Sequence, residues 1–164
     1  MNWAGIIVGL VALERLAELI YARRNTAALL RAGAYETGRR HYPLIVLLHA
    51  GWLAAVYLAA APDAPPVWGW IAVFLLLQAA RYWVIATLGP YWTTRIIAVP
   101  NAPLVTRGPY RFLRHPNYAV VIAEVAVLPL AFREVAVALG FSALNAALLW
   151  WRIRIESAAL DRRG

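Results

Sequence analysis

Five apolar runs, separated by short polar connections, make up most of this 164-residue chain. The runs cover residues 3–21, 43–61, 67–88, 118–132 and 135–151. A helix needs about 20 mostly apolar residues to cross a hydrocarbon core of roughly 30 Å, and the first three runs meet or approach that length. A soluble domain carries roughly 25% charged residues, whereas this chain carries 15%. We therefore predict an all-α integral membrane protein with about five transmembrane helices.

The last two runs are shorter, and only Arg133 and Glu134 separate them. With a rise of about 1.5 Å per residue, a helix over 118–132 reaches only about 22 Å. We expect these runs to form a tight helical hairpin whose helices can fall short of a full crossing.

The arginines alternate between successive connections, which hold five, zero, four and one, and the tail after Trp151 holds four. By the positive-inside rule this pattern places the N-terminus outside, the C-terminus inside and the number of spans at an odd value. The net charge is +8, and its placement in short loops indicates anionic lipid headgroups as partners rather than nucleic acid. The chain has no cysteine, so thiolate metal sites are excluded, and we expect no metal.

Several ionisable side chains interrupt the apolar runs. They are Glu14, Arg15, Glu18, His49, Arg81 and Glu124. Burial of such a group in a membrane costs a few kcal/mol or more, so each is either functional or paired. We favour pairing of the carboxylates with the arginines, which would lock helices together, and we expect His49 to be a satisfied buried histidine. A polar path through a small transporter is the alternative.

The stretch RGPYRFLRHPNY, residues 107–118, is unusually polar for its apolar surroundings. Gly108-Pro109 predicts a turn, and His115-Pro116 predicts the start of a helix, since proline is favoured in the first helical turn. The free N–H groups and positive end of that helix would attract carboxylates and phosphates. The residues alone thus indicate either a pocket for an anion or nucleoside at the membrane surface, or an anchor for lipid headgroups.

The tail WWRIRIESAAL places Arg152 and Glu156 one turn apart on one helix face, while Arg154 points elsewhere. Spacing alone favours a snorkelling arginine with an intrahelical salt bridge. The arginine topology, however, brings this pair to the same side of the membrane as RGPYRFLRHPNY, which favours a shared site.

PLVTRGPYRFLRHPNY, followed by an apolar hairpin and RIRIE, resembles the isoprenylcysteine carboxyl methyltransferase family of integral membrane enzymes. RHPNY matches the RHPxY signature of that family, and the resemblance extends over roughly 95–160. It implies methyl transfer from S-adenosylmethionine to an oxygen of a lipidic acceptor. ERLAELIYARRN, GAYETGRRHYP and LHAGW resemble a bacterial branch, of which some members methylate alkylpyrones or alkylresorcinols. That branch implies a bacterial inner membrane protein, and the arginine pattern places its active site on the cytoplasmic side.

The resemblance also implies site residues, by position. The cofactor site would comprise Ala102, Pro103, Leu104, Val105, Tyr110, His115, Pro116, Asn117, Tyr118 and Glu156. Arg152 would bind the acceptor, and the candidate catalytic residues are Arg152, Glu156 and His115. Many family members have a double glutamate where this chain has Glu156-Ser157. The chain would be one methyltransferase domain, with a three-helix membrane part over 1–88 and a cofactor-binding and catalytic part over 89–164.

These residue types suit the implied chemistry. Glu156 can pair with the ammonium of the cofactor, and the helix start at His115 suits its carboxylate. Arg152 can hold the acceptor oxygen with its planar fork. A carboxylate or acidic enol acceptor needs no strong base, whereas a phenol would need His115 or Glu156. The alternatives are a prenylcysteine carboxyl methyltransferase and, in different classes, a small membrane transporter or a non-catalytic membrane subunit.

Overall fold

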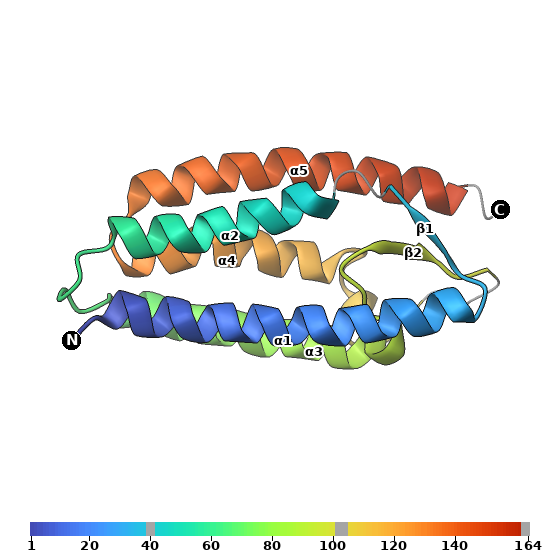
Figure 1. The fold of residues 1–164 in the computed structure, drawn as a ribbon, viewed down its shortest axis with the longest axis horizontal. Coiled ribbons are helices and arrows are strands. Elements are labelled where there is room, and N and C mark those ends of the chain that lie inside the picture. Colours follow the sequence, from blue (N-terminus) through green and yellow to red (C-terminus); the bar gives the residue numbers. More distant parts are fainter. Residues whose placement is uncertain (39–41, 101–104, 162–164) are drawn as a thin grey trace.

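The computed structural model describes residues 1–38, 42–100 and 105–161, with side chains up to residue 156. Within these ranges five α-helices run side by side in one bundle (Figure 1). They are α1 (Trp3–Arg31), α2 (Tyr42–Ala59), α3 (Trp68–Leu88), α4 (Pro116–Ala131) and α5 (Val135–Asp161). Helix α4 packs between α3 and α5, and α2 packs against α1 and α5. The five predicted runs are thus confirmed as five helices.

Turns and prolines end these helices where the sequence predicts. Helix α3 stops at Leu88, because Gly89 adopts a φ of 53° and Pro90 follows in the 3-10 helix η2 (Gly89–Tyr91). A second 3-10 helix, η3 (Gly108–Arg111), forms the predicted turn. Helix α4 then begins at Pro116, with His115 as its N-cap residue.

The length of the last helix differs from the prediction. Helix α5 continues to Asp161, well past Trp151, because Arg152 and the residues after it remain helical. Three described helical segments are long and apolar enough to cross a membrane: Tyr42–Ala59, Trp68–Tyr91 and Val135–Glu156. The described α-helix Pro116–Ala131 is apolar but shorter. The expectation of a short hairpin is therefore wrong for α5 and holds for α4 alone.

A small sheet also departs from the all-α prediction. Strands β1 (Tyr35–Thr37) and β2 (Ile96–Ala98) pair antiparallel, with Glu36 opposite Ile97. Three-residue strands are too short to show the alternation that marks a strand in a sequence. The sheet ties the α1–α2 connection to the α3–α4 connection, at the end of the bundle where the C-terminus lies (Figure 1).

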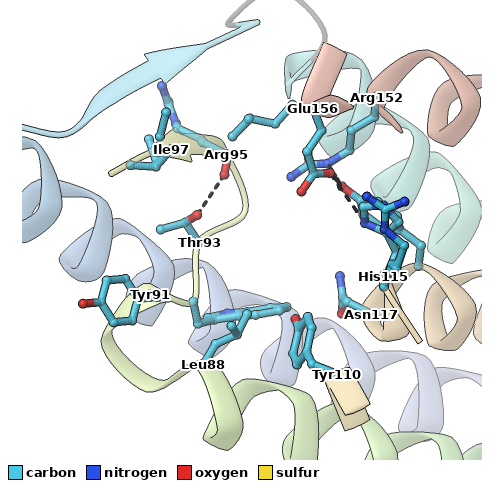
Figure 2. Close-up of a pocket in the computed structure, with 15 residues that line it drawn as sticks. Leu88, Tyr91, Thr93, Arg95, Ile97, Tyr110, His115, Asn117, Arg152 and Glu156 are labelled. Atoms are coloured by element: carbon cyan, nitrogen blue, oxygen red, sulfur yellow. Dashed lines mark hydrogen bonds and ion pairs between the residues drawn. The ribbon is translucent and has the colours of Figure 1, made fainter. Parts of the chain in front are cut away.

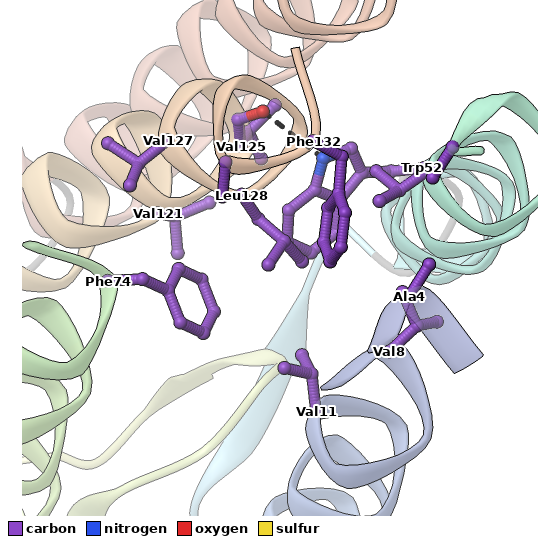
Figure 3. Packing of buried hydrophobic residues seen from close by; sticks show 13 residues of the cluster. Ala4, Val8, Val11, Trp52, Phe74, Val121, Val125, Val127, Leu128 and Phe132 are labelled. Atoms are coloured by element: carbon purple, nitrogen blue, oxygen red, sulfur yellow. Dashed lines mark hydrogen bonds between the residues drawn. The ribbon is translucent and has the colours of Figure 1, made fainter. Parts of the chain in front are cut away.

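A buried apolar cluster fills the opposite part of the bundle, toward the N-terminus (Figure 3). Val56 and Leu128 are fully buried in it. Pro129 lies inside α4 and has no N–H, so it cannot donate to the Val125 carbonyl one turn earlier. The indole Nε1 of Trp52 donates to that carbonyl instead, at 3.1 Å. The indole therefore supplies, from α2, the hydrogen bond that the proline removes from α4.

A buried network of charges joins α1, α3 and α4. Arg81 Nε and Nη2 donate to Glu18 at 2.6 and 2.7 Å, and its Nη1 donates to Glu124 at 3.1 Å. Arg15 donates to Glu18 at 3.1 Å, to Glu124 at 3.3 Å and to Gln78 at 2.6 Å. The predicted pairing of these carboxylates with arginines is confirmed.

His49 is bonded within its own helix. Its Nδ1 lies 2.8 Å from the Ile45 carbonyl oxygen, and its ring meets the ring of Trp52 edge-on. The prediction of a satisfied histidine is confirmed.

Candidate active site

A cavity of about 210 Å³ lies at the sheet end of the bundle (Figure 2). Four parts of the chain line it: the segment 88–98, the turn η3, the first turn of α4 and the C-terminal part of α5. Six residues of the predicted site lie on its wall: Tyr110, His115, Asn117, Tyr118, Arg152 and Glu156. The structure thus brings the RHPNY stretch and the tail of α5 to one cavity.

Tyr118 joins Arg152 and Glu156 of α5. Arg152 Nε donates to the Tyr118 hydroxyl at 2.8 Å, and that hydroxyl donates to Glu156 Oε2 at 2.6 Å. No direct ion pair links Arg152 to Glu156 in the part of the chain that the structure describes. The interpretation as an intrahelical salt bridge is therefore wrong, because one phenol stands between the two groups.

His115 places the start of α4 against the same carboxylate. Its ring stacks on Tyr118, with centroids 5.1 Å apart and an interplanar angle of 16°, and its Nδ1 lies 3.9 Å from Glu156 Oε2. Because His115, Asn117 and Tyr118 all line the cavity, the N-terminal end of α4 and its partial positive charge face it.

Both charged groups keep bonding capacity for a ligand. Arg152 is buried, and its Nη1 donates to the Thr94 carbonyl at 3.0 Å. Among the described residues, neither Arg152 Nη2 nor Glu156 Oε1 has a hydrogen-bond partner. Arg152 and Glu156 therefore offer one guanidinium nitrogen and one carboxylate oxygen, on neighbouring turns of α5.

Tyr110 forms part of the wall as a neutral phenol. Burial, together with the negative charge of Glu156, raises its pKa to about 12. Nearby, Trp92 Nε1 and Asn117 Oδ1 are buried without a hydrogen-bond partner in the described structure. Both residues line the cavity.

Several predicted residues lie elsewhere. Pro116 is buried as the first residue of α4 and does not line the cavity. Val105 lines a neighbouring cavity of about 290 Å³, which shares Leu88 and Tyr91 with the first. Ala102, Pro103 and Leu104 fall outside the described residues.

The segment 88–98 supplies much of the wall, yet no motif singles it out in the sequence. Its contributions include Trp92, Thr93 and Arg95, and Arg114 joins them from the α3–α4 connection. An available signal was the change from an apolar run to the aromatic and polar string YWTTR, directly after Gly89-Pro90. Within the described ranges, no group of three or more histidine, aspartate or glutamate side chains is placed to hold a metal ion.

Comparison with known proteins shows to which family the chain belongs. Over residues 70–162, more than half of the chain, the sequence matches a model of the isoprenylcysteine carboxyl methyltransferase family. An "Uncharacterized protein YpbQ" of Bacillus subtilis is 38% identical over 98% of this chain and 97% of its own length. An uncharacterized protein of Haemophilus influenzae is 25% identical over 98% of this chain and 96% of its own. No solved structure matches the chain. The matched region contains α4, α5 and the cavity residues Arg152 and Glu156, and the chain belongs to the isoprenylcysteine carboxyl methyltransferase family of integral membrane methyltransferases.

Proposed function

We propose that this protein is an S-adenosylmethionine-dependent O-methyltransferase that acts on a lipidic acceptor. One observation carries the proposal. Tyr118, the last residue of RHPNY, holds both Arg152 and Glu156 at one cavity, and all three residues lie within the family match. The positive charge of Arg152 suits a ligand with a negatively charged oxygen, and the negative charge of Glu156 suits a ligand with a positively charged group.

The residues at the cavity suit the polar groups of S-adenosylmethionine. Glu156 Oε1 is available to accept hydrogen bonds from an ammonium group, and charge-assisted bonds of this kind are the strong ones. The N-terminal end of α4, with Arg114 beside it on the cavity wall, suits a carboxylate. When bound, the cofactor supplies a methyl group on a positively charged sulfur.

Arg152 would orient the acceptor. Its Nη2 can donate to the acceptor oxygen while Nε and Nη1 stay bonded to the protein. Holding two reactants in line makes the step effectively unimolecular, which is a large source of rate. An ionised acceptor needs no base, and for a phenol the candidates are His115 and Glu156. Tyr110 is not a candidate, since its pKa of about 12 keeps it protonated.

The arrangement of the helices supports a cytoplasmic active site. The arginine-rich connections and the C-terminus lie at the sheet end of the bundle, and the α2–α3 and α4–α5 connections lie at the other (Figure 1). The positive-inside rule then places the cavity in the cytoplasm and the N-terminus outside. Helix α1 would be a further span. Its buried Glu18 would enter the bilayer paired with Arg15 and Arg81, and this pairing lowers the cost of burying the carboxylate. Similarity to bacterial proteins along the whole chain supports a bacterial inner membrane.

The first test is calorimetric titration of S-adenosylhomocysteine into the detergent-solubilised protein. We expect saturable binding, weakened at least about 10-fold by Glu156→Gln, because a hydrogen bond to a charged group contributes roughly 1.5–3 kcal/mol. His115→Ala should also weaken binding. Arg154→Gln is the matched control, because Arg154 is exposed on the same helix, over the ring of Trp150. A folded wild-type protein that does not bind S-adenosylhomocysteine would refute the proposal.

The second test identifies the acceptor. Among lipidic acceptors we propose an alkylpyrone or alkylresorcinol, on the strength of the N-terminal resemblance, and a prenylcysteine is the competing substrate. Transfer of a radiolabelled methyl group to each compound in mixed micelles distinguishes them. We expect Arg152→Lys to lower turnover of the true acceptor because lysine lacks the planar fork, and to change S-adenosylhomocysteine binding much less. Transfer to the prenylcysteine alone would overturn the acceptor assignment.

A further inference from the structure

The guanidinium group of Arg152 is held at two different atoms. Its Nε is bonded to the Tyr118 hydroxyl, and its Nη1 is bonded to the Thr94 carbonyl in the segment between η2 and β2. Two such contacts fix both the position of the guanidinium group and the orientation of its plane. The direction of the remaining nitrogen, Nη2, therefore depends on where the Thr94 carbonyl lies.

Two residues from the N-terminal half of the chain hold that segment in place. Arg95 Nη1 donates to both carboxylate oxygens of Glu36 on β1, at 2.9 and 3.1 Å. The Arg95 guanidinium also lies 4.6 Å above the ring of Tyr42, at the start of α2. Thr94 Oγ1 donates to the Tyr42 hydroxyl at 3.2 Å. We call Glu36, Tyr42, Thr94 and Arg95 the Thr94 clasp.

The buried member of the clasp is Glu36. Its side chain is 3% exposed, whereas that of Arg95 is 41% exposed. A carboxylate at such a buried position is costly unless it is paired and hydrogen-bonded, and Arg95 supplies two of the hydrogen bonds that Glu36 accepts. Glu36 does not line the cavity and can act on a ligand only through its neighbours.

We propose that Glu36 is a positioning residue for methyl transfer, which orients Arg152 toward the acceptor oxygen through Arg95 and the Thr94 carbonyl. The proposal rests on the function proposed above. Glu36 and Tyr42 lie outside the region 70–162 that the family match covers, so the N-terminal half completes a site that the matched region does not contain by itself. Glu156 is held by Tyr118 rather than by the clasp, so a change in the clasp reaches Glu156 only through Arg152 and Tyr118 and should affect the cofactor contact far less than the acceptor.

Two variants test the clasp. Glu36→Gln removes the charge at nearly constant volume, and Tyr42→Phe keeps the ring under Arg95 but removes the hydroxyl that Thr94 bonds. Because a misplacement of about 1 Å can cost on the order of 100-fold in rate, we expect kcat/KM for the acceptor to fall about 10-fold or more in Glu36→Gln and by less in Tyr42→Phe. Affinity for S-adenosylhomocysteine should stay within about twofold. Tyr35→Ala is the matched control, since Tyr35 adjoins Glu36 on β1, points to the other face of the ribbon and is 48% exposed.

A second readout does not depend on turnover. The ¹⁵N Nε–Hε resonance of Arg152, identified by its loss in Arg152→Lys, should shift in Glu36→Gln and stay in place in Tyr35→Ala. An unchanged resonance, an unchanged kcat/KM in folded protein, or an equal loss of S-adenosylhomocysteine affinity would each overturn the proposal. If the wild-type protein transfers no methyl group, the proposed function fails, and the resonance still decides whether Glu36 sets the position of Arg152.

Discussion

Replacing Trp52 by phenylalanine tests whether the indole compensates for the proline in α4. The substitution removes the Nε1 donor that lies 3.1 Å from the Val125 carbonyl. Pro129 cannot donate in its place, so the carbonyl loses its donor inside the bundle, where Val125 is 1% exposed. An unsatisfied buried group costs roughly 1–3 kcal/mol, and the smaller ring leaves space that adds about 1 kcal/mol or more. We expect a total loss of about 2–4 kcal/mol in the free energy of unfolding.

Tryptophan fluorescence during denaturation by dodecyl sulfate in mixed micelles measures this loss. The deciding experiment is a double-mutant cycle with Pro129→Ala, which restores an N–H one turn after Val125. In the Pro129→Ala background, Trp52→Phe should cost about 1–2 kcal/mol less than in the wild-type background. Trp150→Phe is the control, since Trp150 is 61% exposed. Equal losses in both backgrounds would show that only the size of the indole matters.

Three further predictions concern the charge network, the η3 turn and the cavity wall. Arg81→Gln should cost about 3–5 kcal/mol in the same denaturation assay, because it leaves two buried carboxylates short of a partner; a loss below about 1 kcal/mol would contradict this. Gly108→Ala should lower the free energy of unfolding by about 2–3 kcal/mol, since Gly108 has a φ of 58° and a Cβ there would lie 2.6 Å from Thr87 Oγ1. Adding Thr87→Ala should recover only the part of this loss that comes from the steric clash. Full recovery would show that backbone strain contributes nothing. Burial and the negative charge of Glu156 raise the pKa of Tyr110 to about 12. The difference between the ultraviolet titration curves of the wild-type protein and of Tyr110→Phe should therefore have its midpoint near pH 12. A midpoint near pH 10 would place Tyr110 in open solvent.

The sequence predicts those parts of the fold that depend on local chemistry. Apolar runs give the five helices, and Gly89-Pro90 and His115-Pro116 give two helix boundaries. The pairing of Glu18 and Glu124 with arginines follows from the cost of an unpaired charge in an apolar bundle. The end of α5 was misplaced because a charged residue such as Arg152 ends an apolar run without ending a helix.

The parts of the site that the sequence did not predict depend on contacts between distant segments. Tyr118 lies 38 residues before Glu156, and nothing in the spacing on α5 shows that a phenol will separate Arg152 from that carboxylate. The clasp depends on a sheet with three-residue strands, and its partners Glu36 and Arg95 are 59 positions apart. Neither contact has a periodic signature in the sequence, because each is set by how the helices pack.

The Tyr118 hydroxyl accepts a hydrogen bond from Arg152 and donates one to Glu156, and this has a thermodynamic consequence. A ligand that draws Glu156 away from the phenol removes the acceptor of the hydroxyl proton and so weakens that hydroxyl as an acceptor for Arg152, and the free energies of binding at the two residues are therefore not independent. Linkage requires the effect to be reciprocal: whatever factor the cofactor imposes on acceptor affinity, the acceptor imposes on cofactor affinity. The Tyr118 hydroxyl thus couples the binding of the cofactor to the binding of the acceptor, and Tyr118→Phe would remove this coupling.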